Sequence, residues 1–195
     1  MIADCTGLIL AGGESRRMGR DKTMLEFDGQ TLLQRTATLL QGIFPQVLVS
    51  VRQARSGIAL PQVIDQVPGV GPLAGLCAGL ARMNTSWIFA LAADMPFLGP
   101  DPIRELAARR GESDAVVPVA GNFPQPLAAY YAVTALPALR ATLTGAGKRS
   151  LRAALQGLNV VYVDVSELRG DDPARDFIDL DTPSDLAAAR RGTSI

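Results

Sequence analysis

The sequence predicts a three-layer α/β/α fold with a mostly parallel, twisted sheet. Apolar runs of strand length alternate along the chain with segments of helical length, an order typical of a parallel sheet with helices on both faces. Several of these runs are apolar throughout, as expected of strands that are buried on both sides. A Gly-rich loop follows the first run directly.

In the first part of the chain, local signals define most of the predicted elements. Asp28-Gly29 is a turn signal after the alternating residues 24–27, Thr31 is suited to cap a helix, and Pro72 is suited to the first turn of another. The predicted strands lie at 6–11, 47–51, 62–65 and 87–93, and the predicted helices at 32–41, 72–83 and 100–110.

The second part continues the same alternation. A loop is expected at 121–126, and a second small cationic loop at 145–150 leads into a helix that ends near residue 155. The predicted strands lie at 114–118, 127–133 and 160–165, and further helices at 137–143 and 184–190. With 195 residues and no internal repeat or clean boundary, we expect a single domain over 1–195.

The loop after the first strand is rich in glycine and cations. Backbone N–H groups of glycines can approach a ligand closely, and cations beside them make a site for a polyphosphate. The loop fits neither the P-loop nor the Gly-x-Gly-x-x-Gly fingerprint, because Lys22 does not follow Gly19 directly and Gly12 and Gly13 are adjacent. A solvated cationic loop without a ligand remains the alternative.

Composition excludes several classes of function. The chain has no His, which excludes Ser-His-Asp, Cys-His and ordinary zinc catalysis. Lys+Arg and Asp+Glu are both 19, so no net field favours nucleic acid, and no run has the ~20 apolar residues needed to cross a bilayer. Residues 1–5 lack the pattern of a signal peptide. With only Cys5 and Cys77, we expect a cytoplasmic protein whose thiols are reduced.

Two further positions are candidates for binding. Asp94 directly follows the apolar run 87–93, and ligands of open α/β sheets bind beyond the carboxyl ends of the strands. It can hold a metal there, although an Asp before Pro commonly caps a turn. The helix that starts at Pro72 after Gly71 can bring its backbone close to a ligand, or its small residues can serve close packing only.

The cationic loop resembles the signature of the nucleotidyltransferases that make molybdenum cofactor dinucleotides, in the pattern Leu10-Ala11-Gly12-Gly13-x-Ser15-x-Arg17-Met18-Gly19-x-Asp21-Lys22. The Ala-Gly-Gly form is similar to the GTP-using guanylyltransferases, whereas CTP-using relatives usually have Ala-Ala-Gly. The resemblance implies a Rossmann-like nucleotidyltransferase fold. It also implies that the loop, with Leu10, Ala11, Gly12 and Gly13, wraps the nucleoside triphosphate, while Lys22 and Arg17 offset the charge of its phosphates.

Other positions follow the family's order and rough spacing, namely Asp65, Gly71-Pro72-Leu73, Asp94-Met95-Pro96 and Asp181-Thr182-Pro183. The resemblance implies that Asp65 lies near the guanosine and that Gly71 and Pro72 lie near the nucleotide. Ser50 stands where the family often has an Asn that touches the nucleoside. Asp94 stands where the family binds Mg²⁺, with Mn²⁺ as an alternative ion.

The sequence departs from the family on the acceptor side. Gln125-Pro126 replaces the usual His-Pro, and Asp179-x-Asp181 replaces Asn-x-Asn. Either Asp179 or Asp181 can add a carboxylate to the metal site, or both can simply end a strand and cap a helix. Lys148 and Arg149 are candidates for binding the acceptor phosphate. Their alternative is a cationic helix entry in solvent.

The implied reaction transfers GMP from GTP to the terminal phosphate of molybdopterin, forming molybdopterin guanine dinucleotide and pyrophosphate. We expect residues 1–110 to bind the nucleotide and residues 111–195 to bind the acceptor and partners. The resemblance also implies contact with other molybdenum cofactor proteins and recipient molybdoenzymes, by a chain that we expect to be a monomer. Alternatives are a cytidylyltransferase, a sugar-phosphate nucleotidyltransferase, or a non-catalytic GTP-binding protein that delivers cofactor.

Overall fold

Strand β1 (Cys5–Leu10) lies near the middle of the sheet, and every one of its residues is buried. The computed structural model describes residues 1–12, 22–65, 67, 70–169, 172–180 and 182–190. The other strands are β2 (Glu26–Phe27), β3 (Gln30–Thr31), β4 (Gln46–Val51), β5 (Gln62–Ile64), β6 (Trp87–Ala92), β7 (Ala115–Ala120), β8 (Phe123–Pro124), β9 (Ala128–Ala132) and β10 (Val160–Asp164). The α-helices are α1 (Leu32–Gln41), α2 (Pro72–Arg82), α3 (Pro100–Ala108), α4 (Leu136–Thr144), α5 (Leu151–Ala154), α6 (Pro173–Asp176) and α7 (Pro183–Arg190). The 3₁₀ helices are η1 (Lys22–Met24), η2 (Val133–Ala135), η3 (Leu155–Gly157) and η4 (Val165–Glu167).

The main sheet has the strand order β10-β7-β9-β6-β1-β4-β5, with β8 paired to β7. β1 is parallel to both of its neighbours, β4 and β6. β9 is antiparallel to β6 and to β7. The predicted mostly parallel sheet is therefore confirmed. The reversal of β9 was not predicted, because a fully apolar run has the same pattern in either direction.

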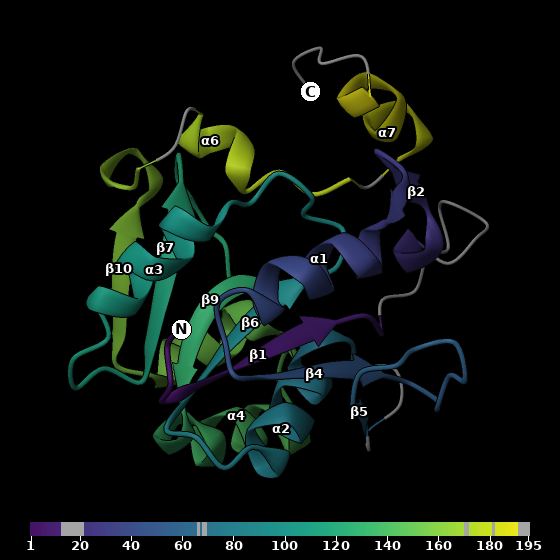
Figure 1. Ribbon diagram of the computed structural model, residues 1–195. Helices are drawn as coiled ribbons and strands as arrows, with labels where there is room; N and C mark the ends of the chain where they lie inside the picture. The colour runs from purple at the N-terminus through teal and green to yellow at the C-terminus, as the bar shows by residue number, and fades with distance from the viewer. Residues whose placement is uncertain (13–21, 66, 68–69, 170–171, 181, 191–195) are drawn as a thin grey trace.

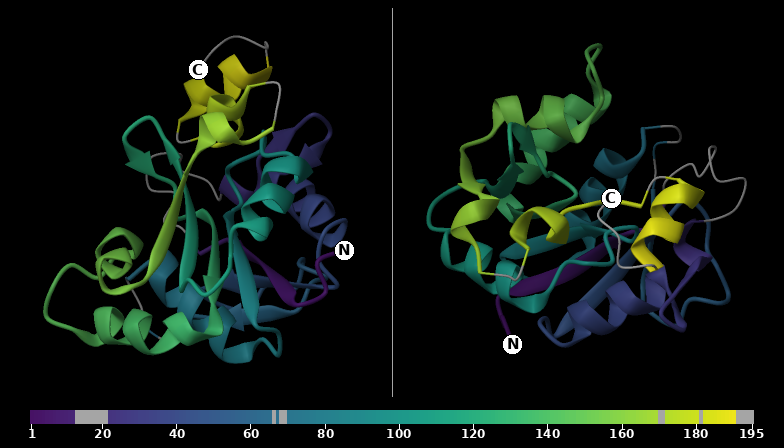
Figure 2. Two further views of the ribbon diagram at one scale, coloured as in Figure 1. Left: turned by 90° about the vertical axis from the view of Figure 1, so that its left-hand side faces the viewer. Right: turned by 90° about the horizontal axis from the view of Figure 1, so that it is seen from above.

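Helices cover both faces of this sheet, which confirms the predicted three layers (Figure 1). Alternate residues of each strand point to opposite faces, so Ile9 packs under α1 and α3 while Leu8 packs under α2 and α4. Each face buries its own apolar cluster. Figure 2 shows the same layers from two other directions, with α6 and α7 (yellow) lying outside them.

Local signals in the sequence account for the segment before α1. Asp28 and Gly29 both have positive φ, of 51° and 77°, as the tight turn of the β2–β3 hairpin requires. Thr31 caps α1 as predicted, and its capping box with Gln34 is complete. The sequence did not predict the short strand β3, the 3₁₀ helices, β8, which lies inside the expected loop 121–126, or α6, which precedes the last helix.

A third, smaller apolar cluster joins distant parts of the chain. Phe27 of the hairpin, Leu32 of α1 and Leu180 of the C-terminal segment are buried together, and Phe97 packs against them. This cluster lies near the upper ends of the layers in Figure 1, where β2, α1 and α7 meet. In the described part of the chain, no helix combines the length and apolarity that a membrane crossing needs.

Candidate active site

A cavity of about 100 Å³ lies at the carboxyl ends of the parallel strands. Leu10, Ser50 and Ala92 stand in one row there, because Leu10 pairs with Ser50 of β4 on one side and with Ala92 of β6 on the other. The residues that line the cavity are Leu10, Gly12, Ser50, Asp65, Gly71, Pro72, Ala92, Asp94 and Leu127. Seven of the sequence-predicted site residues therefore lie together at this edge of the sheet: Leu10, Gly12, Ser50, Asp65, Gly71, Pro72 and Asp94.

Glycines let three segments meet at this edge. A Cβ on Gly12 would lie 3.1 Å from Oδ2 of Asp65, and a Cβ on Gly75 would collide with Oγ of Ser50. Gly71 precedes α2 with φ of 68°, a conformation that residues with side chains rarely adopt. The start of α2 can therefore approach β4 and β5 closely, and the cavity forms where they meet.

Ser50 and Asp65 form a hydrogen-bonded pair on the cavity wall. The Ser50 hydroxyl donates to Oδ1 of Asp65 over 2.8 Å. Burial raises the pKa of Asp65 above its ordinary value of 3.8, while the Ser50 hydrogen bond and the Arg52 guanidinium act in the opposite direction. The pair thus presents an acceptor carboxylate in partly buried surroundings.

Lys22 and Asp94 form an ion pair, although they lie far apart in the sequence. Nζ of Lys22, at the start of η1, is 3.5 Å from Oδ2 of Asp94, which follows β6. Their side chains are only 15% and 24% exposed, so the surrounding protein screens the pair less than water would. The sequence indicated both residues separately, and the structure brings their side chains together.

The residues present fit a Mg²⁺ site of the kind that relies on few protein ligands. Mg²⁺ usually takes one or two carboxylates together with substrate phosphates and waters, and Asp94 supplies one carboxylate on the cavity wall. The described residues contain no cluster of three or more metal-ligating side chains, so phosphate oxygens and waters would complete the shell. The backbone N–H of Leu180 donates to the Asp94 carbonyl over 2.9 Å, which brings the neighbouring Asp179 into this region.

The predicted acceptor residues divide into two groups. Gln125 and Pro126 directly precede Leu127, which lines the cavity. The Gln125 N–H donates to the Pro118 carbonyl over 2.8 Å, so this segment is fixed next to the site. Lys148 and Arg149 are exposed on the loop after α4 and do not line the cavity, and their role stays a prediction.

Several predictions lie outside the described residues. They concern Gly13 and Arg17 of the cationic loop after β1 and Asp181 of the C-terminal segment. Ala11 is described and buried, and its N–H donates to the Ser50 carbonyl over 3.0 Å. Leu127 and Ala92 are cavity residues that the sequence did not indicate, because an apolar residue at a strand end carries no chemical signal.

The raised pKa of Asp65 predicts how the stability of an Asp65→Asn variant depends on pH. In the wild type, the stability contribution of this carboxyl is present below pH 3.8 and is lost as pH rises through the raised folded pKa. Asparagine accepts the same Ser50 hydrogen bond and does not ionise. The variant should therefore melt a few degrees above the wild type near neutral pH, with the gap closing in acid.

Thermal melts across this pH range test the prediction, with the exposed turn variant Asp28→Asn as a control. A gap between Asp65→Asn and the wild type that stays constant with pH would show that burial of the carboxylate has no such cost.

Known proteins resemble this chain in both sequence and structure. The sequence matches the family model described as "MobA-like NTP transferase domain" over residues 7–160. A "Probable molybdenum cofactor guanylyltransferase" of Chloroflexus aggregans is 38% identical over 190 residues, covering 93% of this chain and 91% of that protein. The "Molybdenum cofactor guanylyltransferase" of Vibrio cholerae is 32% identical, covering 95% and 91%.

Among solved structures, the "Molybdopterin-guanine dinucleotide biosynthesis protein A" of Archaeoglobus fulgidus has a TM-score of 0.82 and 30% sequence identity. The match covers 96% of this chain and 97% of that one. Likeness in sequence and likeness in fold thus extend over the same residues, including all of those that line the cavity.

Proposed function

The chain belongs to the MobA-like NTP transferase family, and from this premise we propose that the cavity at the carboxyl edge is where it transfers GMP from GTP to molybdopterin. The activity is that of a molybdenum cofactor guanylyltransferase, which yields molybdopterin guanine dinucleotide and pyrophosphate. The observation that carries the assignment of the site is the Lys22–Asp94 pair beside this cavity. It supplies one cation and one carboxylate where a triphosphate would enter.

The nucleoside of GTP is proposed to bind between Gly12, Gly71 and the Ser50–Asp65 pair. An ionised carboxylate only accepts hydrogen bonds, and a guanosine offers hydroxyl and N–H donors. Substitution of Gly12 would place a Cβ against the Asp65 carboxylate and would close the space that the ligand needs. Leu10, Ala11 and Pro72 would complete the wall of the cavity beside the nucleoside.

The acceptor needs no general base. A phosphate monoester has its second pKa near ~6 and is largely a dianion at neutral pH, so its oxygen can attack the α-phosphorus of GTP directly. A new P–O bond forms between the acceptor oxygen and the α-phosphorus, the bond from the α-phosphorus to the α,β-bridging oxygen breaks, and pyrophosphate leaves with that electron pair. This chemistry agrees with a chain that has no His.

The protein must mainly neutralise charge and hold two anions in line. Lys22 and Arg17 would offset charge on the triphosphate, and such preorganised donors usually contribute most of the stabilisation of a transition state. Asp94 would hold Mg²⁺, with Asp179 or Asp181 as a second carboxylate. When bound, this ion would neutralise phosphate oxygens of the nucleotide and of the leaving pyrophosphate.

The acceptor is proposed to bind toward the half of the sheet that contains β7, β9 and β10. The strands of residues 1–110 form the other half, β6, β1, β4 and β5, which supports the proposed division of labour between 1–110 and 111–195. Gln125 and Pro126 lie where the two halves meet, next to Leu127. Lys148 and Arg149 are proposed to bind the acceptor phosphate.

Pyrophosphate release tests the whole proposal. Purified protein is given molybdopterin, Mg²⁺ and one of GTP, CTP, ATP or UTP, and release is expected with GTP alone. Release with CTP instead would retain the site but overturn the choice of base. No release with any of the four, despite measurable GTP binding, would favour a different acceptor or a non-catalytic delivery protein.

A further inference from the structure

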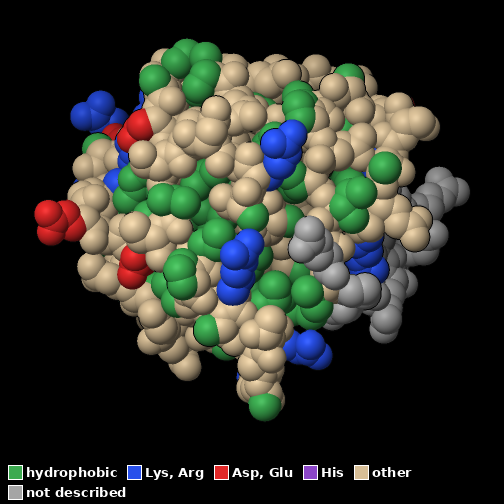
Figure 3. All heavy atoms as spheres, turned by 90° about the horizontal axis from the view of Figure 1, so that it is seen from below, with side chains coloured by type: hydrophobic (Ala, Val, Ile, Leu, Met, Phe, Trp, Pro, Cys, Tyr) green, Lys and Arg blue, Asp and Glu red, His purple; other side chains and the backbone are tan. Residues whose placement is uncertain are grey.

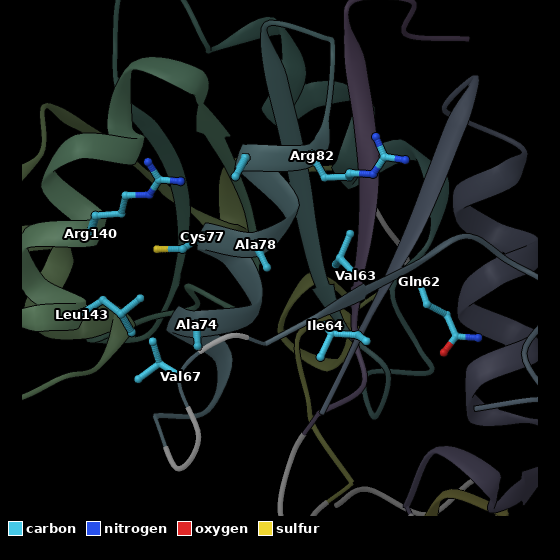
Figure 4. Close-up of a pocket in the computed structure, with 11 residues that line it drawn as sticks. Gln62, Val63, Ile64, Val67, Ala74, Cys77, Ala78, Arg82, Arg140 and Leu143 are labelled. Carbon is cyan, nitrogen blue, oxygen red and sulfur yellow. The ribbon is translucent and has the colours of Figure 1, made fainter. Parts of the chain in front are cut away.

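A second hollow, which shares no lining residue with the active-site cavity, lies over α2. It is a groove of about 440 Å³ whose floor is α2, with α4 along one side and the edge strand β5 along the other (Figure 4). The side chains that α2 contributes are small: Ala74, Cys77, Ala78 and Ala81. From Ala74 to Arg82 the helix is about 12 Å long, enough to support two turns of another helix.

The surface of the groove is mostly apolar and chemically inert. Ile64 is 49% exposed on β5, and Val63, Val67 and Leu143 line the remaining walls. Burial raises the pKa of the Cys77 thiol to about 11, so this sulfur is a packing surface rather than a nucleophile.

In the helical layer that contains α2, α4 and α5, all the charged residues are positive. Residues 66–93 and 115–163 contain no Asp or Glu, and their charged residues are Arg82, Arg140, Lys148, Arg149 and Arg152, all of which are exposed. Arg82 and Arg140 line the groove itself. Figure 3 shows this face with Lys and Arg side chains among the hydrophobic ones, while Asp and Glu gather at its left margin.

We propose that this groove docks a protein partner through an acidic amphipathic helix, whose apolar side chains fill the hollow over α2 while its carboxylates pair with Arg82 and Arg140. Helix-in-groove recognition relies on such apolar anchors, and complementary charge sets orientation and speeds encounter. The chain as a whole has no net charge, so attraction for an acidic partner is local to this layer.

The probe is a fluorescein-labelled synthetic helix of about four turns, with Leu at i, i+3, i+4 and i+7 and Glu on the flanking positions. The fluorescence anisotropy of the peptide should rise as the protein is added. Arg82→Gln and Arg140→Gln should each weaken binding about threefold to tenfold, and Ala81→Glu, at an exposed position, should abolish it. Guanylyl transfer and melting temperature should stay unchanged in all three variants.

The controls separate the groove from general electrostatics. Arg104→Gln, on α3 in the opposite layer, should leave binding unchanged. A scrambled peptide of the same composition has the same charge without an apolar face and should not bind. Equal binding of the scrambled peptide would overturn the proposal, as would Arg82- and Arg140-dependent binding to phosphatidylglycerol vesicles without binding to the peptide.

A second inference rests on different contacts, around the backbone of Asp94. Nε of Arg35, on α1, donates to the Pro96 carbonyl over 2.8 Å, and the hydroxyl of Thr36 lies 3.4 Å from the Ala93 carbonyl. The Leu180 N–H donates to the carbonyl of Asp94 itself over 2.9 Å. The carbonyls of residues 93, 94 and 96 are thus each held by a group from a distant segment.

The Arg35 guanidinium is itself fixed by an aromatic pair. It lies 5.4 Å from the centre of the Phe27 ring, and Phe27 packs edge-on against Phe97 at 5.8 Å. We infer that Arg35 is a positioning residue, which sets the direction of the Asp94 carboxylate through the backbone of the turn. This inference depends on the proposed role of Asp94.

Arg35→Met tests it, because methionine keeps an apolar stem but loses both the hydrogen bond and the charge. The variant should need several times more Mn²⁺ to saturate the protein–GTP complex, and its kcat should fall about tenfold with little change in the KM for GTP. Arg35→Lys should recover part of the loss.

Arg175→Met is the matched control, because the Arg175 guanidinium lies 4.5 Å from the centre of the Phe97 ring, the other member of the aromatic pair. An equal effect of this variant would assign the loss to the aromatic cluster and overturn the role of Arg35. Unchanged Mn²⁺ binding and kcat in Arg35→Met would overturn it too. Absence of turnover in the wild type would instead count against the proposed function, while the Mn²⁺ measurement would still decide about Arg35.

Discussion

Replacement of Asp94 by asparagine is expected to lower guanylyl transfer by about a thousandfold or more, the upper range for loss of one preorganised electrostatic group. Asparagine has nearly the same size, so the turn after β6 should keep its backbone hydrogen bonds to Leu180 and Arg35. The loss would come from the missing negative charge, since a neutral amide is a poor ligand for Mg²⁺. The loss of activity is measured as the rate of pyrophosphate release over a series of Mg²⁺ concentrations.

Binding measurements decide what that loss means. Calorimetry with Mg²⁺–GTP should show weakened binding to Asp94→Asn, and normal binding would refute the metal assignment even if turnover is lost. Asp179→Asn is the informative companion variant. A similar loss there would identify Asp179 as the second carboxylate, whereas full activity would leave that role to Asp181 or to no second residue.

Replacement of Lys22 by alanine should lower turnover about a hundredfold, the usual effect of removing one oriented charge donor from an active site. The ammonium is largely buried beside Asp94, so water cannot easily replace its charge. The effect should fall mainly on kcat, because charge on the transferring phosphate and the leaving pyrophosphate grows in the transition state. Steady-state kinetics with GTP measure both parameters.

Two comparisons sharpen this test. The double variant Lys22→Ala/Asp94→Asn should be much less impaired than the product of the single effects, because residues in direct contact are not additive. Lys148→Ala should leave the KM for GTP unchanged and raise that for molybdopterin if Lys148 binds the acceptor. Near-normal turnover of Lys22→Ala would remove Lys22 from the mechanism.

The fold was largely predictable, because its signals are local. The apolar run 87–93, the Thr31 cap and the Asp28-Gly29 turn each specify their own conformation, and the structure confirms them. The direction of β9 was not predictable in this way. Its direction depends on which strands it pairs with, and that is a property of the assembled sheet.

For the site, the sequence indicated residues but not their partners. Asp65 and Asp94 were predicted to bind ligand, and both line the cavity. The Ser50 hydrogen bond to Asp65 and the ion pair of Lys22 with Asp94 join residues on different strands and turns. Arg35 carried no signal, since an arginine on an amphipathic helix is usually only a solvated residue.

The reversal of β9 has a consequence for how this protein can diverge. Because β9 runs against its neighbours, the segment that enters it reaches the same edge as the ends of β1, β4 and β6. The connection between β7 and β9 is held to the sheet by two hydrogen bonds. The Gln125 N–H donates to the Pro118 carbonyl of β7, and the Ala92 N–H of β6 donates to the Leu127 carbonyl. Insertions or substitutions between these anchors can therefore change the surroundings of the cavity beside Leu127 while β1, β4, β5 and β6 stay intact. Under the proposed division of labour, nucleotide recognition and acceptor recognition can evolve as separate modules on one continuous sheet.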